Sequence, residues 1–267
     1  MIRIQTKRDA LKATLFLAFI IVLLFLMAPT YRGANGPASD GLTIARLKYT
    51  IRPDQTDPAK GYYTDADTPS FEDNLCSLLA RLMRIQCTFK DIVYVEPSSK
   101  ELFKYPLVIM EEPEQAIFSD KDVANMREWL ARGGTLMVED FHGDEDFGPA
   151  LAQLEKLRLE GWYFSELKTN HAMFHVFYDL DEIVQAVNDT VNDCRPQGCP
   201  QYENGDSGRF PHVFAFSDDA GYPRIVMNFN NDCGDGIQWL DKPDYDLAMS
   251  KYCIKFYTNQ VLWHESH

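Results

Sequence analysis

Several signatures of known chemistry are missing from this chain. None of its six cysteines forms a C-x-x-C pair, which argues against a thiol redox centre or a zinc ribbon. There is no G-x-G-x-x-G and no Walker loop, so no recognised motif would bind a nucleotide. An H-E-x-x-H zinc motif is also missing, and we find no internal repeat. The charge pattern, the cysteines and the expected fold therefore carry the interpretation.

Positive charge is scarce, with 26 Lys and Arg against 40 Asp and Glu. Residues 1–12 contain four of the basic residues and one of the acidic ones. The rest of the chain therefore has 22 basic and 39 acidic residues, a net charge of about −17. Such a domain is a poor partner for nucleic acid or anionic lipid and a suitable one for basic proteins. The alternative is that the charge only keeps the domain soluble.

Charge is absent altogether from Ala13 to Tyr31. The most apolar stretch of this segment, ATLFLAFIIVLLFLMAP, is near the lower length limit for a helix that crosses a bilayer. We therefore predict a transmembrane helix at 13–31. A cleaved signal peptide is the alternative, but the apolar run is long for one and no A-x-A site follows. The basic residues of 1–12 place that end in the cytoplasm. We therefore expect a linker at 32–41 and a periplasmic domain at 42–267, anchored in a bacterial inner membrane.

The six cysteines are an even set, and the periplasm permits disulfides. Six cysteines allow fifteen pairings, of which we favour those that are local in the sequence. Cys194 and Cys199 bracket a tight Arg-Pro-Gln-Gly loop. The expected pairs are Cys194 with Cys199, Cys76 with Cys87, and Cys233 with Cys253.

A strand, a helix and a second strand follow one another between residues 105 and 140, in YPLVIMEE, SDKDVANMREWLARGG and TLMVED. Ser119 and Asp122 have the spacing of a helix-capping box. The strand cores LVIM and TLMV carry no charge, which is typical of a sheet covered on both faces. The pattern predicts a doubly wound, mostly parallel α/β fold. Further strands are expected at 42–49, 91–96 and 212–229, and helices at 71–82, 147–157 and 246–263.

The ordered pieces IARLKY, LFKYPLVIM, WLARGGTLMVED, HAMFHVFYDL and DYDLAMSKYCIKFYTNQVLW resemble a bacterial family, domain of unknown function 4159. The resemblance extends from Leu42 to the C-terminus. It implies a class I glutamine-amidotransferase-like, flavodoxin-like α/β domain in a membrane-associated protein, and no established activity. The loop with Cys194 and Cys199 departs from the family pattern and suggests a stabilised variant.

An amidotransferase-like enzyme needs a nucleophile on a sharp turn after a strand. The two corresponding turns, VIMEEPEQ and VEDFHGDEDFG, contain neither Cys nor Ser. We therefore expect no catalysis of this type.

A metal site is a sharper hypothesis, because α/β folds bind ligands at the carboxyl ends of their strands. A hard cation such as calcium would accept the oxygens there. The alternative is a solvated acidic loop, since the D-x-D-x-D-G spacing is missing. The residues concerned are Glu139, Asp140, His142, Asp144, Glu145 and Asp146.

His171 and His175 have the i, i+4 spacing that places two imidazoles on one helical face, as zinc or iron would require. Both match histidines of the family pattern. The alternative is a structural hydrogen-bonding pair, because apolar residues surround them. Asp140 and His142 would complete a metal site with them only if the fold brings the two segments together.

Our leading functional hypothesis is a non-catalytic accessory subunit without a cofactor, which docks on a larger inner-membrane complex. Photosynthetic and respiratory assemblies are the hosts we consider. The rival is a periplasmic metal- or ligand-binding enzyme that uses Asp140, His142, His171 and His175. A third hypothesis, from the resemblance, is a component of a cell-envelope or stress system.

Overall fold

The structure, a computed structural model, describes residues 41–53, 66–87 and 89–267. The predicted cytoplasmic segment and membrane span, residues 1–12 and 13–31, lie outside this part, as does the linker apart from Gly41. Among the described residues, no helix has both the length and the apolar character needed to cross a membrane.

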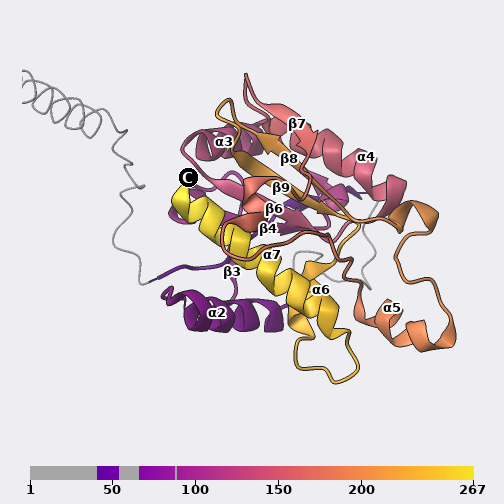
Figure 1. Cartoon of the computed structure of the whole chain (residues 1–267). Helices are drawn as coiled ribbons and strands as arrows, with labels where there is room; N and C mark the ends of the chain where they lie inside the picture. Colours follow the sequence, from indigo (N-terminus) through magenta and orange to yellow (C-terminus); the bar gives the residue numbers. More distant parts are fainter. Residues whose placement is uncertain (1–40, 54–65, 88) are drawn as a thin grey trace, which may run out of the picture. The chain divides into compact units, whose positions relative to one another are not determined.

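Seven strands form the central sheet, which is largely parallel (Figure 1). The first five in spatial order pair in parallel, and the last two extend the sheet by antiparallel pairing. The mostly parallel α/β fold is therefore confirmed, as is the pair of strands expected at 212–229, whereas the antiparallel edge strand at 163–166 was not predicted. In order, the strands are β3 (Val93–Val95), β1 (Ala45–Leu47), β4 (Leu107–Glu111), β6 (Thr135–Glu139), β9 (Pro223–Phe229), β8 (His212–Ser217) and β7 (Tyr163–Glu166). A separate antiparallel pair joins β2 (Thr50–Ile51) and β5 (Ala116–Ile117).

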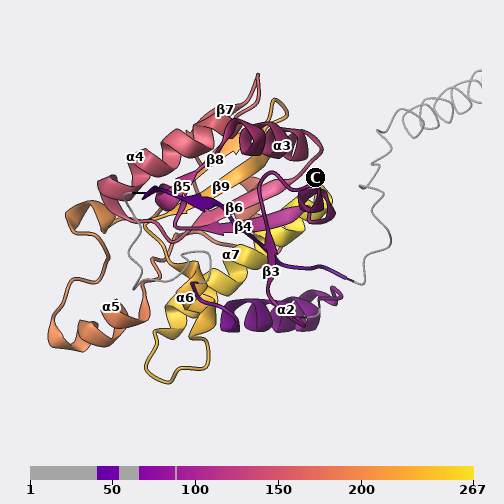
Figure 2. The same cartoon turned by 180° about the vertical axis from the view of Figure 1, so that it is seen from behind.

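Helices cover both faces of the sheet (Figures 1 and 2). One face packs against α2 (Ser70–Met83), α6 (Cys233–Gln238) and α7 (Leu247–Ser266), and the other against α3 (Asp120–Ala131) and α4 (Gly143–Leu154). A short α5 (Asp189–Cys194) lies in the connection between β7 and β8. The 3-10 helices are η3 (Lys100–Lys104), η4 (Pro113–Gln115), η5 (Glu155–Leu157), η6 (Ala172–His175), η7 (Arg195–Gln197) and η8 (Asp206–Gly208).

Strand β4 shows how the sequence produces two hydrophobic cores. Successive side chains of a strand point to opposite faces, so Leu107 and Ile109 join the core under α2 and α7. Val108 and Met110 join the core under α3 and α4. All four side chains are buried, which explains why this strand has an uninterrupted apolar run.

The predicted strand–helix–strand unit is β4, α3 and β6, and its capping box is present. The Ser119 side chain accepts a hydrogen bond from the backbone N–H of Asp122, whose carboxylate accepts one from the backbone N–H of Ser119. These bonds satisfy two backbone groups that the first helical turn leaves without partners.

Replacing Ser119 by Ala is expected to reduce the free energy of unfolding by about 1 kcal/mol, because one capping bond is lost. Ser119→Asp is the matched control, since its carboxylate still accepts the bond. Denaturant unfolding of both variants measures the difference. Equal stability of the Ala and Asp variants would contradict the role of the cap.

Two expected elements differ from the structure. The strand predicted at 42–49 is only three residues long, and its polar Arg46 is buried because two carboxylates neutralise it. The helix predicted to start at Phe147 begins at Gly143, because Asp144, Glu145 and Asp146 form its acidic first turn. Acidic residues suit that position, since the amino end of a helix carries partial positive charge.

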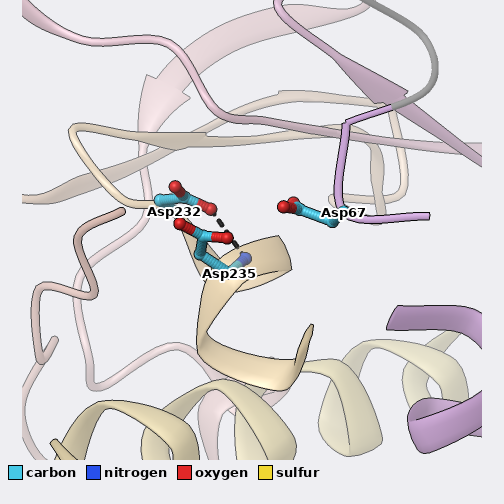
Figure 3. Close-up of side chains that lie close together, drawn as sticks. All are labelled: Asp67, Asp232 and Asp235. Atoms are coloured by element: carbon cyan, nitrogen blue, oxygen red, sulfur yellow. Dashed lines mark hydrogen bonds between the residues drawn. The ribbon is translucent and has the colours of Figure 1, made fainter. Parts of the chain in front are cut away.

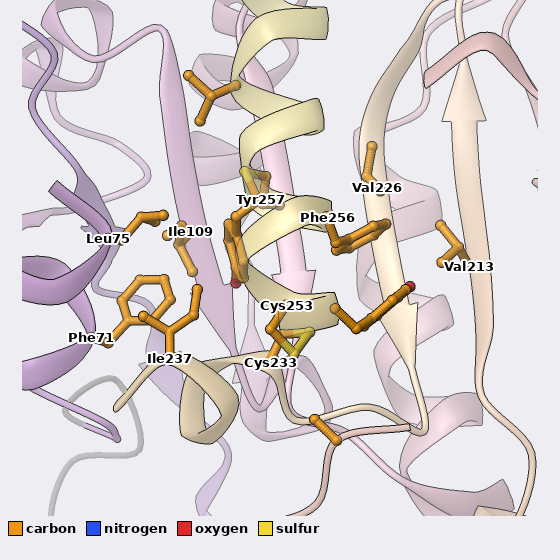
Figure 4. Packing of buried hydrophobic residues seen from close by; sticks show 14 of the residues in the cluster. Phe71, Leu75, Ile109, Val213, Val226, Cys233, Ile237, Cys253, Phe256 and Tyr257 are labelled. Atoms are coloured by element: carbon orange, nitrogen blue, oxygen red, sulfur yellow. A yellow bond between two sulfur atoms is a disulfide. The ribbon is translucent and has the colours of Figure 1, made fainter. Parts of the chain in front are cut away.

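All three predicted disulfides are present. Cys76–Cys87 ties α2 to the chain segment after it, and Cys194–Cys199 closes a small loop at the end of α5. Cys233–Cys253 joins α6 to α7 inside the core (Figure 4). No free cysteine remains.

Candidate functional site

Acidic and amide residues occupy the carboxyl ends of three neighbouring strands. Glu111 ends β4 and Glu139 ends β6, and their side chains are only 3% and 1% exposed. The residues just after β4, β6 and β9 are Glu112, Asp140 and Asn230, with φ of 43°, 55° and 56°. Left-handed conformations of non-glycine residues gather at functional sites, and this edge of a parallel sheet is where α/β folds bind ligands.

Two other segments bring carboxylates to the same edge. Asp67 comes from the loop before α2, while Asp232 and Asp235 come from the start of α6. Figure 3 shows the side chain of Asp67 facing Asp232 and Asp235. One carboxylate oxygen each of Asp67, Glu111 and Glu139 lie within 4.8 Å of one another, and the same holds for Asp67, Asp232 and Asp235. We call these five residues the acidic cluster.

Three oxygens of the acidic cluster are buried and have no hydrogen-bond partner among the residues that the structure describes: Oδ2 of Asp67, Oε1 of Glu111 and Oε1 of Glu139. The other oxygen of Glu139 accepts a hydrogen bond from the backbone N–H of Gly234 at 3.0 Å. Buried polar atoms normally have partners, so each unpartnered oxygen requires an explanation. Here three of them, from three separate segments, belong to one group of mutually close carboxylates.

Arg46 forms an ion pair with one member of the cluster, Glu111. Arg46 is 2% exposed and also forms an ion pair with Glu72, and its Nη1 donates to the carbonyl of Ala66 at 2.7 Å. Burial acts to lower the pKa of Arg46, but Glu111 and Glu72 outweigh it and the net shift is upward. Among the described residues, these ion pairs with Arg46 leave the other carboxylates of the cluster without a cationic partner.

The pKa values of the cluster reflect this excess of negative charge. Burial raises the pKa of Glu139 to about 7, even though a hydrogen bond from Tyr257 opposes the shift. Burial, reinforced by neighbouring carboxylates, also raises the pKa of Asp67 and Asp232 well above their usual range. Burial and mutual repulsion therefore favour the protonated forms of these carboxyl groups when no further cation is bound.

Asp140 and His142, predicted as metal ligands, border the acidic cluster. His142 is 4% exposed, and its Nε2 lies 3.3 Å from Asp140 Oδ1 and 3.8 Å from Glu203 Oε1. Burial alone would lower the pKa of His142. The two carboxylates outweigh burial, so the net shift of this pKa is upward. The negative charge of Asp140 also contributes to the raised pKa of Asp67. Whether Asp140 and His142 bind a metal stays a prediction.

His171 and His175 lie elsewhere and do not share a helical face. His171 precedes η6 and accepts the backbone N–H of Met173, while both ring nitrogens of His175 already have partners, Thr169 and Asp179. These bonds agree with the structural alternative.

The ring of His171 contacts Trp263, next to His264 at the end of α7. His264 bonds Thr135 at the start of β6, whereas Asp140 follows the end of that strand. A five-residue strand separates the two ends by roughly 16 Å. The structure therefore does not bring the four predicted ligands together.

Sequence reasoning missed Asp67, Glu111, Asp232 and Asp235. A usable signal existed for Glu111, because it follows an apolar strand core directly, as Glu139 does. Asp232 and Asp235 lie a few residues beyond the end of β9, at the start of α6, so the signal for them is weaker. Asp67 has no such signal, because only the tertiary fold brings its loop to the sheet edge.

The turn after β4 contains Glu112 and η4 and has neither Cys nor Ser. All six cysteines are joined in disulfides, so no thiol is free to take a nucleophilic role. Carboxylates are thus the reactive or ligating groups at this edge.

Comparison with known proteins identifies the family of this chain. No curated protein matches the chain. A protein family described as a domain of unknown function (DUF4159) matches residues 43–264, which span nearly all of the α/β domain. The chain therefore belongs to the DUF4159 family.

Proposed function

We propose that this domain binds a hard divalent cation, Ca²⁺ in the first instance, through Asp67, Glu111 and Glu139. The observation that carries the proposal is the set of three buried carboxylate oxygens without partners among the described residues, which belong to three carboxylates that lie close to one another. A cation would satisfy all three oxygens and offset the negative charge that Arg46 leaves uncompensated.

The donor atoms favour a hard cation over zinc. The acidic cluster consists only of carboxylates, whereas zinc sites normally include thiolate or imidazole ligands. Asp232 and Asp235 lie next to the proposed ligands and would add further negative charge. Ca²⁺ takes six to eight oxygens in flexible geometry, which suits ligands contributed by separate loops.

The test is thermal unfolding of the full-length protein in mild detergent, after removal of metal with a chelator. We expect Ca²⁺ to raise the unfolding temperature, since a ligand at about 100 times its dissociation constant stabilises by about 2.7 kcal/mol. Mg²⁺, Mn²⁺ and Zn²⁺ are titrated in parallel. The absence of any shift up to about 10 mM, beyond the range of weak extracellular calcium sites, would contradict the proposal.

A second candidate function is a membrane-anchored, non-catalytic accessory subunit on the periplasmic side. Glu112 stands in the turn where an amidotransferase-like enzyme holds its nucleophile, and every cysteine is cross-linked. These observations support a domain that docks on a larger membrane complex and stabilises it, without hydrolytic chemistry of that type. The parallel strands occur in the order second, first, third, fourth, fifth, which supports a flavodoxin-like fold.

Native electrophoresis with mass spectrometry of gently solubilised membranes tests the accessory role. We expect stoichiometric co-migration of the chain with a larger complex of integral membrane proteins. Migration as a particle of its own mass of 30.7 kDa plus detergent would contradict this role and leave cation binding unaffected.

A further inference from the structure

The first turn of α6 supplies much of the acidic cluster. Asp232 caps the helix by accepting the backbone N–H of Asp235 at 2.8 Å, and Gly234 donates its backbone N–H to Glu139. Cys233 lies between these residues in the sequence. A helix of six residues has little stability of its own, so its position depends on what holds it.

The Cys233–Cys253 disulfide holds this turn against α7. The two Cα atoms are 5.1 Å apart, and both side chains are fully buried. Tyr257 lies one helical turn after Cys253 and is close enough to Glu139 for each to shift the pKa of the other. Figure 4 shows Cys253 and Tyr257 on the same helix, beside the disulfide. One covalent bond therefore fixes the turn that carries Asp232, and that donates a hydrogen bond to Glu139, to helix α7.

Close packing leaves this arrangement little room to adjust. A Cβ atom added to Gly236 would lie 2.7 Å from the Sγ of Cys253. One added to Gly234 would lie 1.9 Å from Oδ2 of Asp67 and 3.1 Å from Oε1 of Glu139, two of the unpartnered oxygens. The backbone of α6 thus touches the disulfide on one side and the proposed ligands on the other, so a shift of the turn moves the ligands.

We infer that the Cys233–Cys253 disulfide regulates the cation site, which reaches full affinity only when this pair is oxidised. The inference rests on the proposed function, because it concerns the same carboxylates. Coupling between two sites is reciprocal, so a disulfide that strengthens cation binding must itself become harder to reduce when the cation is bound. In reduction by a dithiol, the Cys233–Cys253 bond breaks, both cysteines gain a proton, and the two reductant sulfurs form a disulfide.

The first experiment compares calcium titrations of full-length Cys233→Ala/Cys253→Ala and Cys194→Ala/Cys199→Ala with the unmodified protein. The control disulfide closes a short, partly exposed loop at the end of α5 and joins neither α6 nor α7. We expect the first variant to bind Ca²⁺ at least about tenfold more weakly, the size typical for loss of a group that orients a metal ligand. The control should keep its affinity. Equal affinity of both variants would overturn the inference.

The second experiment needs no variant and remains informative if the first one fails to fold. The unmodified protein is treated with dithiothreitol with and without Ca²⁺, and each disulfide is followed by alkylation and peptide mass spectrometry. We expect Ca²⁺ to slow reduction of Cys233–Cys253 and to leave Cys194–Cys199 unchanged. Equal protection of both, or of neither, in a protein shown to bind Ca²⁺ would overturn the inference. If the unmodified protein does not bind Ca²⁺, the proposed function itself fails.

Discussion

Glu139→Gln is expected to weaken calcium binding at least about tenfold and, at the same time, to stabilise the protein when no cation is present. Binding weakens because the substitution removes one of three ligand charges. The cation-free protein gains stability because the amide of Gln cannot ionise and so avoids the cost of a buried charge. The opposite signs of the two effects distinguish a ligand from a residue that serves only the fold.

The size of the stabilising effect follows from the pKa of Glu139. In the folded, cation-free protein this pKa is raised from 4.5 to about 7. A raised pKa means that the contribution of Glu139 is fully present below pH 4.5 and is lost as pH rises through 7. Above pH 7 the loss is on the order of 3 kcal/mol, and the Gln variant does not incur it.

Denaturant unfolding at pH 8, with chelator and then with excess Ca²⁺, measures both effects on the full-length protein. Glu160→Gln is the matched control, because Glu160 is exposed and lies before β7, away from the cluster. It should change neither quantity. A Glu139→Gln variant that is destabilised under both conditions would contradict the ligand role.

Calcium affinity is also expected to fall steeply as pH decreases below about 7. A cation binds the ionised carboxylate, so below its pKa of about 7 Glu139 must release a proton for each cation bound. For each proton that the cation displaces, the affinity falls about tenfold for every unit by which the pH decreases. Asp67 and Glu111, whose pKa values burial raises well above the usual range, add to this dependence.

Isothermal titration in two buffers with different heats of ionisation counts the released protons directly. We expect at least about one proton per cation at pH 6, and fewer for Glu139→Gln, which has one titrating carboxyl less. Affinity that stays constant from pH 6 to 8 without proton release would show that the carboxylates are not the ligands.

Much of the fold was predictable because its local signals agree with one another. The apolar core of β4, the capping box at Ser119 and the start of β6 all pointed to one strand–helix–strand unit, which the structure contains. The start of α4 was misplaced because its acidic first turn has the composition of a loop. The antiparallel edge strand β7 was missed because its sequence, YFSE, is short and partly polar.

The site was less predictable because it depends on contacts between distant segments. Its location at the carboxyl end of β6 was anticipated, and Asp140 and His142 do border the acidic cluster. The buried partners of Arg46 could not be foreseen, since a charged residue in a strand normally indicates an exposed position. His171 and His175 had suitable spacing for a metal, but spacing has that meaning only within an α-helix, and the segment forms η6.

Anomalous X-ray scattering from crystals of the protein grown with Mn²⁺ tests the central claim most directly, because it locates the ion. Mn²⁺ shares the preference of Ca²⁺ for oxygen ligands. The account predicts an anomalous peak within coordination distance of Asp67, Glu111 and Glu139. A peak at other side chains, or no peak among these three carboxylates, would contradict it.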